Sequence, residues 1–169
     1  MNDGDYLVDI LDKKGNIVDQ KLRKNITKGV DIYHAVYGVI VTPRGNIAVS
    51  KIAQREDMPN LHAGSFGCTA ATIKRVGETG DQAMKRAINN ELGINIPLEL
   101  ITEKIIAVDG TYRKIGLYKL LSGVPRNYSK SDIEYIEEFK DEEFLTMLSK
   151  EPKKITPILK LFWESLSNA

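Results

Sequence analysis

Residues 32–42 (IYHAVYGVIVT) constrain the fold most strongly, because they form a run of β-branched and aromatic residues with little polarity. A strand of this composition is typically buried on both faces, so the segment predicts an inner position in a covered sheet. Helices are the usual cover for such a sheet. A turn over residues 43–46 (PRGN) follows, and residues 47–52 return as a partner strand.

Residues 80–92 predict an amphipathic helix with defined ends. Thr79 and Gln82 have the spacing of a capping box, and Asp81 favours the positive end of the helix dipole. Gly93 stands where a C-terminal cap belongs. The apolar residues that recur at helical spacing are Met84, Ala87 or Ala83, Ile88 and Leu92. One face of this helix should therefore pack against the sheet.

Two hairpins flank these central elements. The first occupies residues 5–22 around a Gly-containing turn, and the second joins residues 98–108 to 112–121 through Asp109-Gly110. Between them, residues 54–62 predict a loop, and the small apolar residues 64–72 (GSFGCTAAT) predict a strand.

The C-terminal part predicts two helices after one ambiguous segment. Residues 131–139 (SDIEYIEEF) fit either a strand or a capped helix. Residues 141–149 predict a short helix. Residues 156–167 predict a last helix with Thr156 as its cap, which should bury Ile158, Leu161, Phe162 and Leu166. The whole chain, residues 1–169, then forms a single mixed α/β domain.

Composition excludes several classes of function. The chain has 169 residues and is 42% hydrophobic, which suits one core. Its 24 basic and 23 acidic residues give a formal charge of +1, so general attraction to nucleic acid or an anionic membrane is not expected. An acidic start without a long apolar run predicts a cytoplasmic protein. A single cysteine allows no internal disulfide, and two histidines, His34 and His62, exclude a multi-histidine metal site.

Residues 72–94 carry a partial motif. The Nudix box has the pattern G-x5-E-x7-R-E-U-x-E-E-x-G-U, where U is aliphatic. The matching positions are Glu78, Arg86, Ile88, Glu91 and the closing pair Gly93-Ile94, all at the spacing of the pattern. The departures are Thr72 for the first Gly, Ala87 for the Glu after the Arg, and Asn90 for the first of the paired glutamates. The box is therefore degenerate.

The resemblance extends over nearly the whole chain. Residues 6–12 (YLVDILD), 32–41 and 155–162 (ITPILKLF) are similar to the subgroup of Nudix proteins close to isopentenyl-diphosphate isomerase. The chain thus resembles the Nudix hydrolase superfamily, and this resemblance implies a Nudix-type α/β/α sandwich with a mixed sheet. The box would form a loop, a helix and a turn.

The resemblance also implies a chemistry. Family members hold Mg²⁺, or Mn²⁺, on box glutamates and cleave a diphosphate. This implies a pyrophosphohydrolase of a nucleoside-diphosphate-linked or other small diphosphate substrate. Its catalytic groups would be Glu91 and Glu78, with Asn90 as a further metal ligand. Ala87, Asn90 and Glu91 share one helix face, which offers a single carboxylate, so metal affinity and activity should be reduced.

Residues outside the box are expected to assist. Lys51, Arg55 and Arg86 are candidates for binding substrate phosphate. In the family the Arg of the box orients the glutamates, and the alternative for Arg86 is an exposed side chain paired with Asn89 or Asn90. The acid that assists Glu91 at the metal is expected to be Glu78 or, alternatively, one of Glu134, Glu137 and Glu138.

Two other functions are compatible with the same sequence. The runner-up is a catalytically silent Nudix-fold module that binds a nucleotide or a protein. Isopentenyl-diphosphate isomerisation is a third reading, because that enzyme uses a Cys with a Glu, but a buried structural role suits Cys68 better. His34 is expected to be a packed core or site-lining residue. The two apolar N-terminal strands would suit a homodimer interface.

Overall fold

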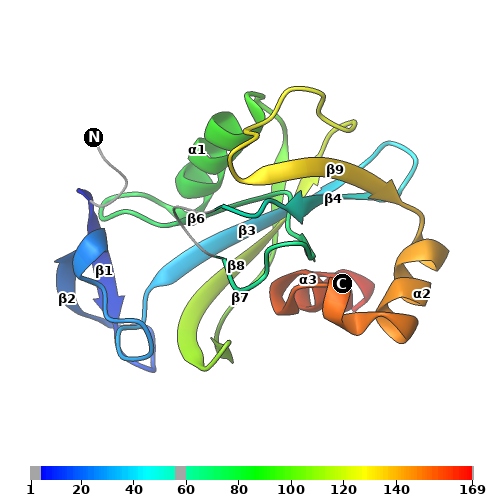
Figure 1. Cartoon of the computed structure of the whole chain (residues 1–169). Helices are drawn as coiled ribbons and strands as arrows, with labels where there is room; N and C mark the ends of the chain where they lie inside the picture. The colour runs from blue at the N-terminus through cyan, green and yellow to red at the C-terminus, as the bar shows by residue number, and fades with distance from the viewer. Residues whose placement is uncertain (1–4, 56–59, 169) are drawn as a thin grey trace.

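The computed structural model describes residues 5–55 and 60–168 and shows a mixed sheet between helices (Figure 1). The main sheet has the order β5-β4-β3-β8-β7, with β6 paired to β3 and β9 paired to β4. Its strands are β3 (His34–Val41), β4 (Ile47–Ile52), β5 (Phe66–Gly67), β6 (Ala70–Ile73), β7 (Leu98–Val108), β8 (Thr111–Leu121) and β9 (Ile133–Phe139). Only β3 and β8 are parallel; the other pairs are antiparallel.

The N-terminal hairpin forms a sheet of its own. It consists of β1 (Leu7–Leu11) and β2 (Ile17–Leu22), followed by the 3-10 turn η1 (Arg23–Asn25). An isolated bridge between Leu11 and Ile32 joins it to the chain just before β3. Figure 1 shows this small sheet beside the N-terminal end of β3, which confirms the predicted hairpin and gives it a position at the edge of the domain.

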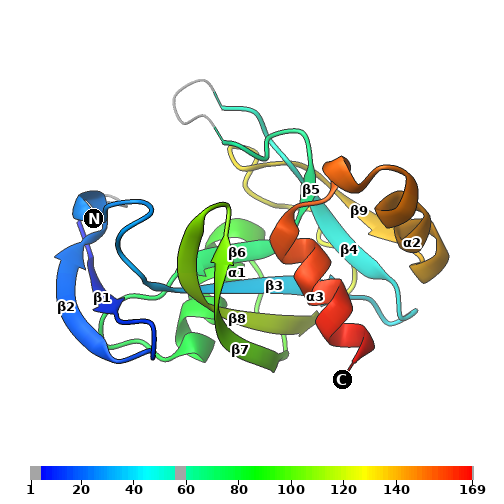
Figure 2. The same cartoon turned by 90° about the horizontal axis from the view of Figure 1, so that it is seen from below.

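Helices cover both faces of the main sheet, as the composition of residues 32–42 predicts. Val36 and Ile40 of β3 pack with α1 (Gly80–Leu92), whereas Val39 packs with the C-terminal helices. Those helices are α2 (Asp141–Lys150) and α3 (Pro157–Ser167), joined by η2 (Pro152–Lys154). Figure 2 shows α3 crossing the face of the sheet opposite α1. The expected layered α/β/α architecture is confirmed.

The central helix matches its prediction in both ends and face. The Thr79 hydroxyl accepts from the Gln82 backbone N–H, the Gln82 side chain completes the capping box, and Gly93 adopts the left-handed conformation at φ 64°. The buried residues are Ala83, Met84, Ala87, Ile88 and Leu92. Burial of this apolar face fixes the rotation of α1 about its axis, so its polar residues near the C-terminal end face a defined direction.

The sheet divides at β3, and this division opens the site. β6 pairs with residues 35–38 of β3, and β4 pairs with Ile40 and Val41 before turning away to β5 and β9. Thr69 holds the branch point, because its hydroxyl donates to the Ala48 carbonyl at 2.6 Å and accepts from the Ile40 N–H at 3.0 Å. The separation of β4 from β6 leaves space beside the C-terminal half of α1.

Several sequence expectations are corrected in detail. Residues 64–72 form two short strands rather than one, because Cys68 and Thr69 interrupt pairing at the branch point. The ambiguous segment 131–139 is a strand, paired with β4 along its length. Helix α3 buries Leu159 and Trp163 beside Ile158 and Phe162, whereas Leu161 and Leu166 are only partly buried, so the helix is rotated relative to the expected face.

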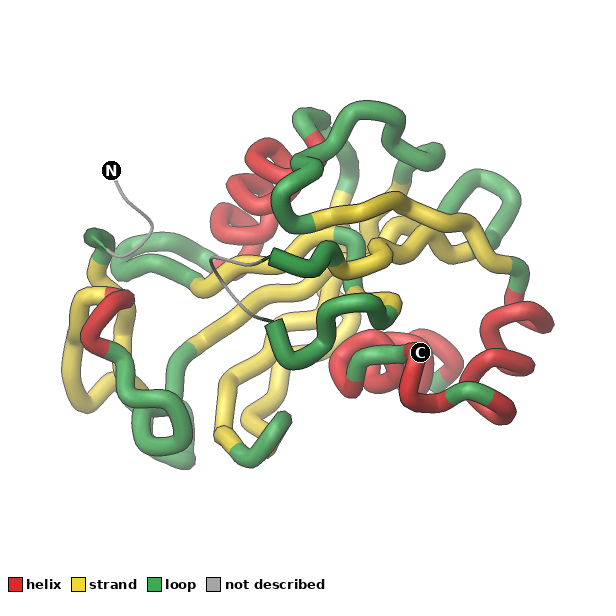
Figure 3. Tube along the Cα trace, in the orientation of Figure 1, coloured by secondary structure: helices red, strands yellow, loops and turns green. Residues whose placement is uncertain are grey.

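The loop after β4 is described only in part. Of the predicted loop 54–62, residues 56–59 lie outside the described residues. Figure 3 shows the connection from β8 to β9 as an irregular segment at the top of the view. None of the helices within residues 5–55 and 60–168 combines the length and apolar character that a membrane crossing requires.

Candidate active site

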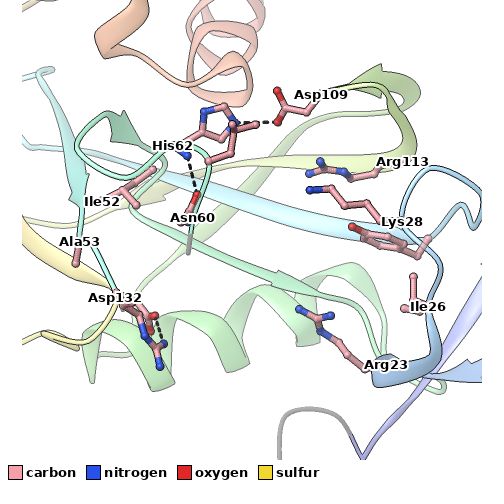
Figure 4. A pocket seen from close by; sticks show the side chains of 13 residues that line it. Arg23, Ile26, Lys28, Ile52, Ala53, Asn60, His62, Asp109, Arg113 and Asp132 are labelled. Atoms are coloured by element: carbon pink, nitrogen blue, oxygen red, sulfur yellow. Dashed lines mark hydrogen bonds and ion pairs between the residues drawn. The ribbon is translucent and has the colours of Figure 1, made fainter. Parts of the chain in front are cut away.

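A cleft lies where the sheet divides, and it consists of three cavities that share Asn60 and Asp132 as wall residues. The helix cavity, of about 600 Å³, includes Arg86, Ala87, Asn90 and Glu91 of α1. The basic cavity, of about 520 Å³, includes Arg23, Lys28, Tyr33, Arg55 and Arg113 (Figure 4). The inner cavity, of about 240 Å³, reaches Glu91, Cys68, His62 and Asp109. The cleft therefore connects the end of α1 to a cationic region.

Glu91 is the acidic centre of the cleft. Burial raises the pKa of its carboxyl group to about 8; a backbone hydrogen bond from Ala71 lowers it, and the nearby Asp132 carboxylate raises it further. None of the ion pairs within the described ranges includes Glu91. A carboxylate that burial makes costly to ionise, without a basic partner, is suited to receive a metal cation.

Glu78 occupies a different environment. Its Oε1 accepts from Arg86 Nε at 2.7 Å, and its Oε2 accepts from the Arg75 backbone N–H at 2.9 Å and from Arg86 Nη2 at 3.1 Å. Burial alone would raise the pKa of Glu78, but these donors outweigh it and hold the pKa below its usual value. Both oxygens are thus committed to protein donors, and Glu78 is not among the described residues that line the helix cavity.

Arg86 ties the loop before α1 to strand β6. Besides Glu78, it donates to the Thr72 hydroxyl at 3.2 Å and to the Ile73 carbonyl at 2.9 Å. Thr72, the departure from the first Gly of the box, therefore supplies an acceptor for this arginine. The alternative of an exposed Arg86 paired with Asn89 or Asn90 is wrong.

The two other box departures face the cleft together with Glu91. Ala87 is only 2% exposed and Asn90 is exposed, yet both line the helix cavity with Glu91, as their spacing on one helix face predicts. This wall accordingly carries one carboxylate and one amide.

The second acid of the helix cavity is Asp132, which sequence reasoning missed. The expected candidates lie elsewhere: Glu134 and Glu137 are exposed on β9, and Glu138 accepts from Thr42 and Asn46. Asp132 precedes β9, and its carboxylate accepts from Arg55 Nη1 at 3.0 Å. Asp132, just before the strand, is among the described residues that line the three cavities, whereas these three glutamates are not.

Of the three predicted phosphate-binding residues, two line the cleft and one does not. Arg55 lines the basic cavity and Arg86 the helix cavity. The ammonium group of Lys51 lies 4.7 Å from the centre of the Phe66 ring, and Lys51 is not among the described residues that line the three cavities. Basic residues that were not predicted, Arg23 and Arg113, occupy the cleft instead.

His34 and Cys68 have contrasting positions. His34 lies near the start of α1, with its Nε2 3.7 Å from Glu103 Oε2, and burial lowers its pKa to about 4. It is a packed residue rather than part of the cleft wall. Cys68 does line the inner cavity with Glu91, and burial raises the pKa of its thiol to about 12. The thiol is therefore protonated at neutral pH.

The donor set fits a hard cation that is held in part by its substrate. Within the described residues, no three His, Cys, Asp or Glu side chains gather as a complete metal site. The cleft nevertheless offers the Glu91 and Asp132 carboxylates and the Asn90 amide oxygen. Mg²⁺ commonly takes one or two protein carboxylates, and water and substrate phosphate supply its remaining ligands.

The fold and the cleft define a Nudix-fold protein, and comparison with solved structures shows this fold. A crystal structure of DR0079 from Deinococcus radiodurans superposes with a TM-score of 0.77 at 15% identity, covering 94% of this chain and 98% of that one. A MutT Nudix hydrolase from Burkholderia pseudomallei gives a TM-score of 0.60 at 21% identity, covering 80% of this chain and 98% of that chain. The Nudix domain of Shewanella oneidensis NrtR, solved with ADP ribose, gives 0.60 at 11% identity, covering 79% and 85%.

Sequence comparison agrees with the structural one. An uncharacterized Nudix hydrolase, orf19, of Rhodococcus erythropolis is 28% identical over 121 residues, or 69% of this chain. The match spans 64% of that relative's length. No protein-family model matches the chain. The resemblance to the Nudix hydrolase superfamily is confirmed, whereas the closer likeness to the isomerase subgroup stays a prediction.

Proposed function

We propose that this protein is a divalent-metal-dependent pyrophosphohydrolase of a small diphosphate substrate, with a nucleoside-diphosphate-linked compound as the expected class. The observation that carries the proposal is Glu91, a half-buried carboxyl group that no ion pair among the described residues includes and that lines a cleft with a cationic wall. A diphosphate carries the negative charge that such a wall attracts, and a metal ion on Glu91 would complete the match.

Each part of the cleft has a role in this reaction. Glu91, Asp132 and the Asn90 amide would hold Mg²⁺ or Mn²⁺, which supplies charge neutralisation and orients the diphosphate when bound. Arg23 and Lys28 would bind phosphate oxygens that lie beyond the metal.

Glu78, first expected as a ligand or base, enters the proposal as a positioning residue. Both of its carboxylate oxygens accept protein hydrogen bonds, and it fixes the Arg86 side chain that anchors the start of α1 to β6. Arg86 itself lines the helix cavity, so its guanidinium lies within the wall that a substrate phosphate would meet. Lys51 has no part in the proposal because its ammonium group lies over Phe66.

The substrate class draws on two supports. Tyr33 and Tyr37 line the helix cavity, and aromatic rings of this kind can stack against a nucleobase. The structurally similar NrtR domain was solved with ADP ribose, which is a nucleoside diphosphate joined to a sugar. The charge balance of +1 supports a small-molecule partner rather than a nucleic acid.

A panel of diphosphates with Mg²⁺ or Mn²⁺ tests the proposal. The wild-type protein should release a nucleoside monophosphate from at least one nucleoside-diphosphate-linked compound. Glu91→Gln should reduce kcat by at least about 100-fold, because it removes the anionic ligand of the metal. Glu137→Gln is the matched control, since Glu137 is an exposed glutamate on β9. If the wild-type protein hydrolyses none of the compounds in the panel, the proposal that it is a pyrophosphohydrolase is refuted.

The silent-module alternative makes a different prediction for repaired variants. Ala87 and Asn90 both face the helix cavity, so glutamates there would restore the lost carboxylates beside Glu91. A silent module should gain hydrolysis only in the Ala87→Glu/Asn90→Glu double variant. A native enzyme is active before the repair.

The isomerase alternative has one geometric observation in its favour, since Cys68 and Glu91 line the same inner cavity. Isopentenyl diphosphate incubated with the wild-type protein and with Cys68→Ala separates this reading from hydrolysis. Isomerisation that depends on the thiol would support it; equal turnover by both proteins, or none, would exclude it.

The N-terminal hairpin supports the proposal of a homodimer. Ile17 and Val18 of β2 are 61% and 63% exposed, which leaves apolar side chains on the small sheet. Light scattering should then report two copies per particle for the wild type and one copy for Val18→Glu. A monomeric wild type would contradict this proposal.

A further inference from the structure

His62 and Asp109 form a hydrogen-bonded pair in the wall of the cleft (Figure 4). His62 Nε2 lies 2.8 Å from Asp109 Oδ2, and the two side chains are 29% and 22% exposed. His62 belongs to the loop after β4, and Asp109 to the turn between β7 and β8. Both line the basic and the inner cavities, so the pair is accessible to a ligand in either one.

The pair has the arrangement of an oriented imidazole. A carboxylate accepts hydrogen bonds, so His62 Nε2 carries the donated proton and Nδ1 retains its lone pair. The His62 backbone N–H donates to the Asn60 side-chain oxygen at 2.9 Å, which fixes the loop locally. Asp109 and Gly110 have φ values of 52° and 78°, as expected for a tight Asp-Gly turn, and this turn directs the carboxylate. An imidazole with a fixed tautomer is a good proton acceptor.

The inner cavity brings this pair to the acidic end of α1. Its volume is about 240 Å³, so groups on its wall face a common small space. Glu91 from α1, Asp132 from the segment before β9 and Arg113 from β8 are the other charged wall residues. Arg55, which bonds Asp132, lines the adjoining basic cavity.

The altered box leaves the reaction without an evident base. Ala87 has no proton-accepting group, and the Asn90 amide is not basic. Glu91 is engaged when it holds a metal, and Glu78 is saturated by Arg86 and Arg75. The thiol of Cys68 on the same wall stays protonated, because burial raises its pKa. The imidazole of His62 is then a wall group that can accept a proton through its Nδ1 lone pair.

We infer that His62 is the general base of the proposed hydrolysis and that Asp109 positions it. The inference rests on the proposed function. The oxygen of a water molecule attacks one phosphorus atom of the diphosphate while His62 Nδ1 accepts a proton from that water. The bond from this phosphorus to the bridging oxygen breaks, and its electron pair leaves with the second phosphate group. His62 then releases the proton to solvent.

His62→Gln tests this role with little structural disturbance. The glutamine amide can still donate to Asp109, so the connection between loop and turn is retained while the base is lost. The kcat should fall by about 100- to 10,000-fold, the usual contribution of a general base. His34→Gln is the matched control, because His34 is the other histidine of the chain and lies outside the cleft. Asp109→Ala should give a smaller reduction than His62→Gln.

The pH profile supplies a readout that a structural tether would not change. At saturating Mg²⁺, kcat of the wild type should decline on the acidic side of its pH profile, because a protonated imidazole cannot accept a proton from water. His34→Gln should keep this acidic limb. In His62→Gln the limb should disappear, and added imidazole should restore part of the activity. Calorimetry should show unchanged uptake of Mg²⁺ and nucleotide.

The outcomes separate the two proposals. An active wild type whose His62→Gln variant stays within threefold of it overturns the base assignment alone. A wild-type kcat that does not fall on acidification overturns it as well, and this measurement does not depend on folding of the variant. A wild type without activity on the whole panel overturns the hydrolase proposal and the base assignment with it.

Discussion

The buried carboxyl group of Glu91 predicts that the metal-free protein loses stability as the pH rises through neutrality. Burial raises its pKa from the ordinary 4.5 to about 8, so the folded state binds this proton more tightly than the unfolded state. The resulting stability is fully present below about pH 4.5 and is lost as the pH rises through 8. This direction is opposite to that of a salt-bridged carboxylate.

The magnitude follows from the two pKa values. At about 1.4 kcal/mol per pKa unit, the difference between 8 and 4.5 corresponds to about 5 kcal/mol over the full pH range. Between pH 6.5 and 8.5 the loss amounts to about 2 kcal/mol. A domain of this size has a total stability of about 5–15 kcal/mol, so this loss is measurable.

Urea denaturation of the metal-free protein at several pH values measures the effect, with EDTA present throughout. Glu91→Gln should abolish this part of the pH dependence and make the protein more stable than the wild type at pH 8.5. Burial lowers the pKa of His34 to about 4, so its contribution to stability increases with pH, in the opposite direction to that of Glu91 and at lower pH. This contribution is the same in the wild type and in Glu91→Gln, so it cancels when the two proteins are compared. Glu137→Gln, at an exposed position, should behave like the wild type.

Two results would refute the reasoning. Equal slopes of stability against pH in the wild type and in Glu91→Gln would show that Glu91 ionises without a burial penalty. A wild type that Mg²⁺ with a diphosphate fails to stabilise at pH 8.5 would show that the ionised carboxylate does not receive a cation. We expect Mg²⁺ with a diphosphate to restore stability at pH 8.5, because a ligand that binds only the folded state stabilises it.

Other substitutions test the framework of the site. Arg86→Ala should lower the free energy of unfolding by about 3 kcal/mol, because it leaves the half-buried Glu78 without its partner; Lys85→Ala, on the exposed face, should have no such effect in urea denaturation. Thr69→Val should destabilise by about 2 kcal/mol, since two buried backbone groups lose their hydroxyl partner, and unchanged stability would contradict this. Lys28→Ala should raise KM several-fold with little change in kcat, whereas an equal loss in both would indicate a role in the transition state.

Local signals predicted most of the fold. The capping box and Gly93 fixed the ends of α1, and the composition of residues 32–42 fixed the central strand, because both depend on neighbours within a few residues. The segment 131–139 could not be assigned in this way. The segment forms a strand because it pairs with β4, which lies more than 80 residues earlier in the chain, and a local pattern does not show this pairing.

The site was less predictable because its contacts are long-range. The motif positions of Glu91 and Arg86 lie on the wall of the helix cavity, and their roles stay predictions. The Asp132–Arg55 and His62–Asp109 pairs span 77 and 47 residues, so no spacing rule reveals them. The Asp109-Gly110 signal predicted a turn correctly, but a turn signal gives no information on which distant side chain the aspartate will bind.

The charge distribution of the cleft has a consequence for how metal and substrate bind. In the helix cavity the wall carboxylates are Glu91 and Asp132, so the protein alone offers a cation few ligands there, whereas the basic cavity attracts the phosphate groups that would supply the rest. Each ligand should therefore improve the binding of the other, and linkage requires the two improvements to be the same factor. Replacing Asn90 with Glu would add charge to the metal side only. That change should strengthen binding of Mg²⁺ alone and reduce the factor by which a diphosphate enhances it.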